Sequence, residues 1–518
     1  MKVVFYNRDF SDMPIQPNVE LTVERYSKST FGGPKLATIS VSGFEDDIYG
    51  LANYLRCPVE IINDHGDAVW WGYLSRLDIN MGSTIFGVDI ETMSNNVAVA
   101  YTDQGERYTT DWSSDSDSIN EYGTKEILLS KANTTAADAL QFRDVYLANA
   151  KYPIPVMRFG GSVKSIARLT CRGWIYTLDW EYYANATGRE AYEEIGTGGR
   201  EIGEDDRPIL AQSFEIAATS SWDASSIWLR VWKQGTSSPT DNLVVSLKAD
   251  NAGEPGATLA SGLVDGDDIG TSAEWTEFVL DSAVTLNTST TYWIHAARSG
   301  SVDADAYFMV DTNFLAGYPR GELFLYNTSL GAWGEDIYIF WGDLLFIVVG
   351  DTENTNQITT LVSTSGQYFN GAIIEDTSGL TSNPYRSGDT TAYSELLDLL
   401  NTGTSNDRRL LCEVTRNRYL RIYEEPEKPS KNSDSDGLNR NNELVNAYNV
   451  RLDDSYCPVG YWCSLKDIVP ASVDYSLISD PSIFMVDEAQ YDAVRGEYHI
   501  LGTRNQSNQL DIGGVVQG

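Results

Sequence analysis

Apolar and polar residues alternate along much of the chain, the pattern of strands that bury one face. Residues 37–42 (ATISVS) alternate in this way and follow the turn signal Phe31-Gly32-Gly33-Pro34, so two strands are predicted within 19–43. The strands predicted next are 59–63, 68–79, 84–92 and 97–101, taken as one hairpin and then a second pair. Together these segments predict a compact β unit at the start of the chain.

Three segments change to the helical period. Residues 44–56, 133–150 and 390–402 carry apolar residues at helical spacing, and Thr134 or Thr135 is placed to cap the second of them. Outside the middle of the chain, the other segments are predicted as strands. They are 163–183 with its aromatic end, a short strand over 358–363, and a hairpin of 409–414 with 419–423.

The composition and the spacing of the predicted strands change in the middle of the chain. Residues 185–206 are rich in Gly and acids and are interpreted as a linker. From about 208 to 350, short alternating strands with turn signals every 8–12 residues predict a β-sandwich or jelly roll. After residue 350 the mixture of strands and helices seen before residue 185 returns. The middle segment is therefore expected to be a domain inserted into one body, formed by the residues on either side of it.

Composition supports a mainly β protein with a few helices. The 518 residues include 43 Gly, 13 Trp and 30 Tyr, and 74 acids against 37 Lys plus Arg give a net charge of −37. Such a charge argues against stable nucleic-acid binding and against adhesion to an anionic membrane. The longest apolar stretch, 337–349, is interrupted by Gly342 and Asp343, so no membrane span is expected, and the first residues lack the pattern of a secretory signal.

The residues of catalytic chemistry are scarce. Three His and five Cys have no zinc-ligand spacing, and no nucleophile-elbow, P-loop or metalloprotease motif occurs. The cysteines are expected to be buried thiols. The acidic runs 265–268 and 303–305 are of a kind that could bind calcium, but neither fits the EF-hand loop, and the favoured interpretation is solvated loop charges. We therefore expect no catalytic residues, no metal site and no cofactor.

Tryptophans of the middle segment offer rings that stack on sugars. Trp228 and Trp232 occur on one predicted strand with Leu229 and Val231, and these tryptophans are assigned to the core. Three aromatic residues in loop-like sequence are the candidates for a ligand-binding surface: Trp222, Tyr318 and Trp333.

Several segments of the body, in order, resemble the tail hub family of tailed bacteriophages. They are VWWGYLSRLDI, YGTKEILLS, TAADALQFRDVYLANAKYP, LTCRGWIYTLDWEYY, GDTTAYSELLDLLNTGTSNDRRLLCEVTRNRYLRIYEEP, PVGYWCSLKDIVP and EAQYDAVRGEY. The resemblance implies two barrel-like hub units with small α/β subdomains. It also implies a homotrimer that contacts other tail proteins, namely a distal tail or tube protein and a tip or spike protein.

The middle segment resembles the choice-of-anchor R type of domain, a jelly roll of the carbohydrate-binding kind. The matching stretches are AQSFEI, WLRVWKQGTSSPTDNLVVSLKADNAGEPGATLASG, WTEFVLDSAVTLNTSTTYWIHA and WGDLLFIVVG. With this resemblance, the expected domains are 1–102 (first hub β-barrel unit), 103–155 (α/β subdomain), 156–203 (start of the second hub unit), 204–350 (inserted jelly roll), 351–430 (α/β subdomain) and 431–518 (end of the second hub unit and tail).

The resemblances imply a structural virion protein, not an enzyme. It would be made in the host cytoplasm, would lie at the tail tip or baseplate where the tail tube ends, and would carry an outward adhesion domain for host-surface glycan. An acidic tube wall suits that position because it repels DNA phosphates. The alternative is a polysaccharide-binding or polysaccharide-degrading protein, a lectin or a glycosidase.

Overall fold

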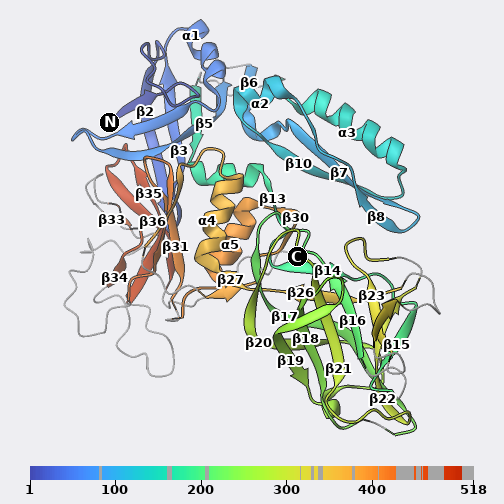
Figure 1. Ribbon diagram of the computed structural model, residues 1–518. Helices are drawn as coiled ribbons and strands as arrows, with labels where there is room; N and C mark the ends of the chain where they lie inside the picture. The colour runs from blue at the N-terminus through green and yellow to red at the C-terminus, as the bar shows by residue number, and fades with distance from the viewer. Residues whose placement is uncertain are drawn as a thin grey trace, which may run out of the picture. The chain divides into compact units, whose positions relative to one another are not determined.

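The chain divides into two compact units, which are described separately (Figure 1). Unit 1 comprises Met1–Tyr183, Thr355–Leu380 and Gly388–Gly518, and unit 2 comprises Ala184–Asn354 and Thr381–Ser387. The computed structural model describes residues 1–80, 84–159, 166–204, 209–237, 239–314, 317–327, 332–335, 342–375, 380–405, 408–427, 449–450, 457, 459–464 and 483–504. These residues are mainly β-strand with a few helices, which confirms the predicted class.

Unit 1 is built on one extended sheet with the strand order β1-β4-β5-β12-β3-β2-β35-β36-β33. In that order, the strands are Lys2–Phe5, Pro58–Ile62, Ala68–Asn80, Ile166–Arg172, Phe31–Ser42, Glu20–Ser29, Ile483–Asp492, Glu497–Arg504 and Asn449–Val450. The strands that branch from it are β6 (Thr84–Asp89), β11 (Val156–Phe159), β28 (Gly371–Ile374), β31 (Leu410–Val414), β32 (Tyr419–Glu424) and β34 (Trp462–Ser464). Chain-distant segments therefore share one sheet: β2, near the start, pairs with β35, near the end.

A smaller sheet of unit 1 joins β10 (Glu126–Lys131), β7 (Asn96–Asp103), β8 (Glu106–Thr109) and β9 (Ser113–Ser114). The helices of this unit are α1 (Glu45–Gly50), η1 (Leu51–Tyr54), η2 (Ile90–Thr92), α2 (Ser116–Tyr122), α3 (Ala136–Ala150), η3 (Trp174–Trp180) and α5 (Ala392–Asn401), and α4 (Asn354–Ser365) begins at the division. Thr135 caps α3 by accepting a hydrogen bond from the Asp138 amide at 3.3 Å. No helix among the described residues is long and apolar enough to span a bilayer.

Three predictions about unit 1 are wrong. Strands β6 and β7 do not pair, because β6 joins β5 and β11 whereas β7 joins the smaller sheet. The aromatic run after β12 is the helix η3, in which Trp174, Leu178 and Trp180 are all buried instead of alternating. The predicted strand at 358–363 is part of α4, where Ile358, Leu361 and Val362 bury one helical face.

The predicted cysteine environment is largely confirmed. Cys57, Cys171 and Cys412 are buried free thiols, and Cys457 is partly buried. Burial raises the pKa of each of these thiols, so they resist ionisation. Residues 428–448 and 505–518 lie outside the described residues.

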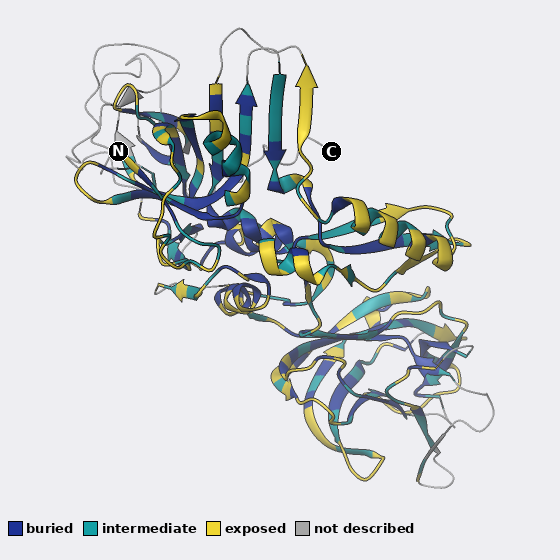
Figure 2. Ribbon diagram, turned by 90° about the horizontal axis from the view of Figure 1, so that it is seen from above, coloured by how far each residue is buried: buried dark blue, intermediate teal, exposed yellow. Residues whose placement is uncertain are grey.

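Strand β11 leaves apolar side chains in solvent. All four of its residues are exposed, as Figure 2 shows, and Phe159 keeps 85% of its surface. Tyr152 and Ile154, just before it, are also exposed. In the described part of the chain β11 pairs with β6 alone, so one of its edges is open. We call Tyr152, Ile154, Val156, Met157 and Phe159 the apolar strip.

Unit 2 consists of two antiparallel sheets around one core. The first sheet contains β14 (Arg189–Tyr192), β26 (Phe346–Val349), β17 (Trp222–Gly235), β22 (Ala306–Asn313), β15 (Gly198–Ile202), β20 (Glu274–Leu286) and β25 (Asp343–Leu344). The second contains β19 (Pro255–Val264), β18 (Leu243–Asp250), β21 (Tyr292–Arg298), β16 (Ile209–Phe214), β23 (Leu323–Asn327) and β24 (Ala332–Glu335). Residues of both sheets, such as Phe278 and Ile294, share one apolar cluster.

The remaining elements complete the description. Unit 2 also holds η4 (Gly266–Asp268) and the short pair β27 (Thr352–Glu353) with β29 (Thr381–Ser382), whereas β13 (Tyr182–Asn185) and β30 (Arg386–Thr391) run across the division between the units. The linker predicted at 185–206 is wrong, because this segment contains β14 and β15. Its alternate residues Glu190 and Tyr192 are buried. Its polar composition gives no sign that it pairs with β26 and β22.

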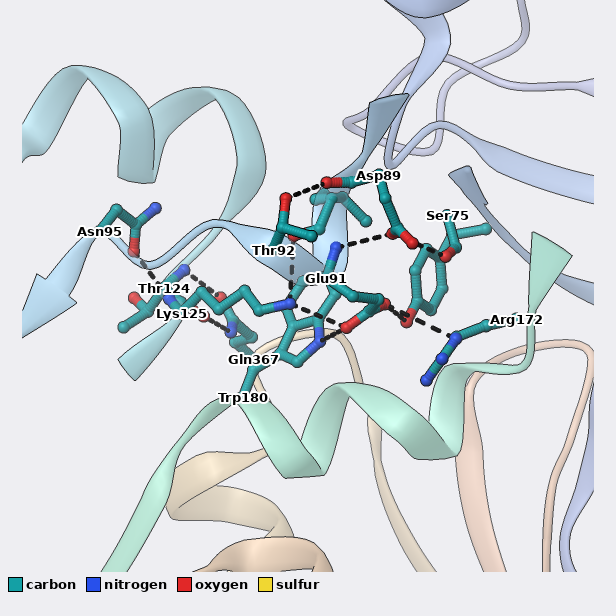
Figure 3. A network of polar contacts seen from close by, with 12 residues as sticks. Ser75, Asp89, Glu91, Thr92, Asn95, Thr124, Lys125, Arg172, Trp180 and Gln367 are labelled. Atoms are coloured by element: carbon teal, nitrogen blue, oxygen red, sulfur yellow. Dashed lines mark hydrogen bonds and ion pairs between the residues drawn. The ribbon is translucent and has the colours of Figure 1, made fainter. Parts of the chain in front are cut away.

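A partly buried carboxylate, with 20% of its side-chain surface exposed, connects several elements of unit 1 (Figure 3). Glu91, in η2, accepts hydrogen bonds from the Tyr73 hydroxyl at 2.9 Å and from the Trp180 indole at 3.2 Å. Lys125 Nζ lies 2.8 Å from Glu91 Oε2 and 4.8 Å from the centre of the Trp180 ring. Arg172 Nε lies 3.9 Å from Glu91 Oε1. Burial alone would raise the pKa of Glu91, but the charges of Lys125 and Arg172 and the hydrogen bonds from Lys125 and Tyr73 hold it below its ordinary value.

We predict that Glu91→Ala destabilises unit 1 by about 3 kcal/mol or more, because Lys125 is left as a buried ammonium without its carboxylate. Urea unfolding and amide hydrogen exchange of β5 and β10 measure the loss. The control is Glu45→Ala, an exposed first-turn residue of α1, which should change stability by less than about 0.5 kcal/mol.

The role of Glu91 also predicts how folding stability depends on pH. Since the folded-state pKa of Glu91 is depressed, its contribution is present above the unfolded pKa and is lost as pH falls through the folded pKa. The unaltered chain should therefore lose stability on acidification more steeply than Glu91→Ala. Equal slopes in the two proteins would mean that Glu91 is not held ionised by this network.

Candidate functional site

The outer face of the first sheet of unit 2 carries a hollow of about 720 Å³. Two indole rings, Trp228 and Trp275, belong to its wall. We call it the tryptophan hollow. The other lining residues are Arg189, Glu193, Ser225, Ser226, Glu277, Val279, Ile347, Val349, Asp351 and Asn383.

Strand alternation explains why an indole faces outward here. Along β17, Ile227, Leu229 and Val231 are buried in the shared core, whereas Trp228 and Arg230 between them are only partly buried. Side chains at successive strand positions point to opposite faces. Trp228 therefore stands on the face away from the core.

The register of the neighbouring strands brings the second indole to the same face. Trp228 lies opposite Glu277 of β20, and Arg230 lies opposite Trp275. Opposed residues of an antiparallel pair share a face, and diagonal neighbours lie roughly 7–8 Å apart. Trp228 and Trp275 are such a diagonal pair.

Strand β26 supplies an apolar floor on the other side of β17. Ile347 lies opposite Trp228, and Val349 lies opposite Ser226. Val279 of β20 keeps 64% of its surface exposed. The result is an exposed aromatic and aliphatic surface of the kind that marks a binding site.

Polar groups surround this surface. Arg189 forms an ion pair with Glu193 and lies with its guanidinium carbon 5.1 Å from the centre of the Tyr385 ring. Asn383 is fixed because its Nδ2 donates to the Gly188 carbonyl at 3.0 Å and its Oδ1 accepts from the Tyr385 amide at 2.7 Å. An apolar surface with a few oriented polar groups is suited to binding a ring that has one apolar face and hydroxyls at its edge.

The assignment of Trp228 to the core is therefore wrong. The sequence held the signal, because Ile227, Leu229 and Val231 form one period-two set and Trp228 falls in the other. Trp275 has no comparable signal, since its place beside Trp228 depends on the register of β20 against β17.

The expectation that Trp222 and Tyr318 are exposed in loops is also wrong. Trp222 begins β17 and keeps 6% of its surface exposed, and Tyr318 keeps 4%. The Tyr318 hydroxyl donates to Glu190 Oε1 at 2.9 Å, and its amide donates to Asp343 Oδ2 at 2.7 Å. Burial raises the pKa of Tyr318 well above its ordinary value, with Glu190 adding to the effect. Both residues serve the core.

Trp333 is the candidate that remains partly exposed. It lies on β24 of the second sheet, opposite Tyr326, with ring centres 5.3 Å apart. Its ring centre is 5.9 Å from that of His295, whose pKa burial lowers to about 4. The structure thus separates the three predicted residues, and ligand binding at Trp333 stays a prediction.

The acidic runs contact their own backbone. Asp265 accepts from the Asp267 amide at 2.9 Å, and Asp303 accepts from the Asp305 amide at 2.9 Å. Within the described ranges, no three His, Cys, Asp or Glu side chains come together in a way that would hold a metal ion.

Comparison with known proteins assigns no family. No protein-family model and no curated protein matches the chain. Among solved structures, the chain is similar to the mosquito-larvicidal Cry4Aa toxin of Bacillus thuringiensis at 8% identity, over 58% of this chain and 52% of that one, with a TM-score of 0.14. The chain thus spans about half the length of the toxin structure, and a TM-score this low carries no argument about fold or function.

We predict that Tyr318→Phe destabilises unit 2 by about 1–2 kcal/mol, because buried Glu190 loses one hydrogen-bond donor. Thermal or urea unfolding measures the change. Tyr307→Phe is the matched control, since the Tyr307 hydroxyl makes no hydrogen bond within the described residues and its loss should change little. An equal effect of both changes would contradict the assigned role of Tyr318.

Proposed function

We propose that this chain is a structural protein of a bacteriophage tail, a hub or baseplate component where the tail tube ends, and that unit 2 is its adhesion module for host-surface glycan. The observation that carries the adhesion part is the tryptophan hollow, with Trp228 and Trp275 diagonal to each other on one exposed sheet face. The proposal of a hub rests on the segments of the body that resemble the hub family in the same order along the chain.

The chemistry of the hollow supports weak glycan binding. Indole rings offer a large flat contact area at little entropic cost, and their faces suit the apolar C–H face of a sugar ring. Polar side chains of the lining, such as Asn383 and Ser225, can give the hydroxyls partners. Two antiparallel sheets around one core are what a jelly-roll module requires, and its exposed sheet face is one place where such modules hold ligands.

The charge of the chain supports a place beside the DNA path. A net charge of −37 repels phosphate, so a tube wall built from this protein would not retain passing DNA. The proposed role is structural, and the barrel-like nature of the two hub units belongs to this proposal.

The apolar strip supports assembly into a homotrimer. Residues 151–159 include no acid in a chain that has 74, so this is a place where copies of the chain approach with little repulsion. An open, apolar strand edge readily accepts another strand. A trimer would repeat the hollow three times and strengthen weak contacts by multivalency.

We predict that Trp228→Ala and Trp275→Ala each weaken binding of the full chain to susceptible host cells or to a bacterial polysaccharide array by about tenfold, equivalent to ~1.4 kcal/mol. The loss follows from removing one stacking face. Trp112→Ala, an exposed tryptophan of unit 1, is the control that should bind as the unaltered chain does. Failure of the unaltered chain to bind would contradict the adhesion role, and release of sugar fragments would favour the glycosidase alternative.

We predict that the unaltered chain has the mass of three copies by light scattering and that Met157→Glu with Phe159→Glu reduces it to one. Two charges placed on an apolar contact must lose their hydration, and this opposes association. Circular dichroism should stay native because both side chains are already exposed. Val145→Glu, at an exposed apolar position of α3 outside the apolar strip, is the control. A monomeric unaltered chain would refute the trimer.

A further inference from the structure

The charges around the tryptophan hollow are unequal. Arg189, the basic residue of its wall, is already paired with Glu193. Arg230, beside Trp275 on the same face, is paired with Asp311 through Nη1 and Oδ2 at 2.9 Å. Glu277 and Asp351 have no Lys or Arg at ion-pair distance among the described residues. Two exposed carboxylates therefore stay uncompensated at the hollow.

One of these carboxylates is a direct neighbour of both rings, at the corner of the strand pair diagonal to Arg230. Glu277 is directly opposite Trp228, and it is two residues from Trp275 on the same face of β20. Opposed side chains have Cβ atoms about 4.5–5.5 Å apart. A group bound across both indoles would therefore lie beside the Glu277 carboxylate.

We infer that the tryptophan hollow selects glycans whose sugar units carry free, protonated amines over their N-acetylated or acidic counterparts. This inference rests on the proposed function, because it names the class of glycan that the adhesion site takes. An ammonium is attracted by the face of an indole and by a carboxylate, and both lie here within one hollow. A uronic or phosphorylated sugar would meet Glu277 and Asp351, with each nearby Arg already paired.

The test compares three oligosaccharides of equal length on the full chain by calorimetry: a glucosamine hexamer, its N-acetylated form and a galacturonate hexamer. We expect the glucosamine form to bind about tenfold tighter than the N-acetylated form and the galacturonate form to bind weakest. The preference should fall as salt rises, because exposed charges are screened. It should also fall as pH rises, because the sugar amine loses its proton.

The acidity of the whole chain requires a control for non-specific binding of a polyamine. Glu277→Gln should reduce the ratio of the two affinities towards one. Glu274→Gln removes the same charge three residues away on β20, outside the hollow, and should leave the ratio unchanged. An equal effect of both variants would assign the preference to general charge and overturn the inference.

The outcomes also separate this inference from the proposed function. If the unaltered chain binds glucosamine and N-acetylglucosamine hexamers equally, and Trp228→Ala weakens both, the hollow binds glycan without amine selection and only the inference fails. If neither hexamer binds and no polysaccharide or host cell is bound either, both fail.

Discussion

The carboxylate of Glu91 is the point on which the packing of unit 1 depends. It accepts hydrogen bonds from a strand of the extended sheet (Tyr73) and from the helix that follows β12 (Trp180). It also pairs with Lys125, the residue just before β10 of the smaller sheet. A buried charge is costly unless every partner is present, so these elements are stable only together. Among the described residues the extended sheet and the smaller sheet of unit 1 share no strand, and they are connected through this group.

Local signals in the sequence predict where helices and strands begin and end better than they predict which strands pair. The capped helix α5 begins after Thr391, near the predicted start, because a cap and an apolar face are encoded within a few residues. The polar composition of the segment at β14 and β15 predicts a linker, yet long-range pairing with β26 and β22 makes it part of a sheet. The helix η3 shows no clear helical period in the sequence, because five of its seven residues are buried.

The candidate site likewise depends partly on local sequence and partly on the pairing of distant strands. The outward position of Trp228 follows from its own strand, but the hollow exists only because β20 aligns Trp275 and Glu277 against it. Loop-like sequence was a poor guide to exposure. Tyr318 lies outside any strand and is nevertheless buried, since Glu190 and Asp343 provide partners for its polar atoms.

Unit 2 is assembled from two separate stretches of chain, because Thr381–Ser387 belongs to it in addition to Ala184–Asn354. Asn383, from the shorter stretch, lines the tryptophan hollow and bonds to Gly188 of the longer one. A recombination event that exchanges only the long stretch between two such genes would leave a foreign piece in the wall of the hollow. Gene exchange that preserves this wall must therefore carry α4 and the strands after it together with unit 2, which ties the evolution of the hollow to part of the body.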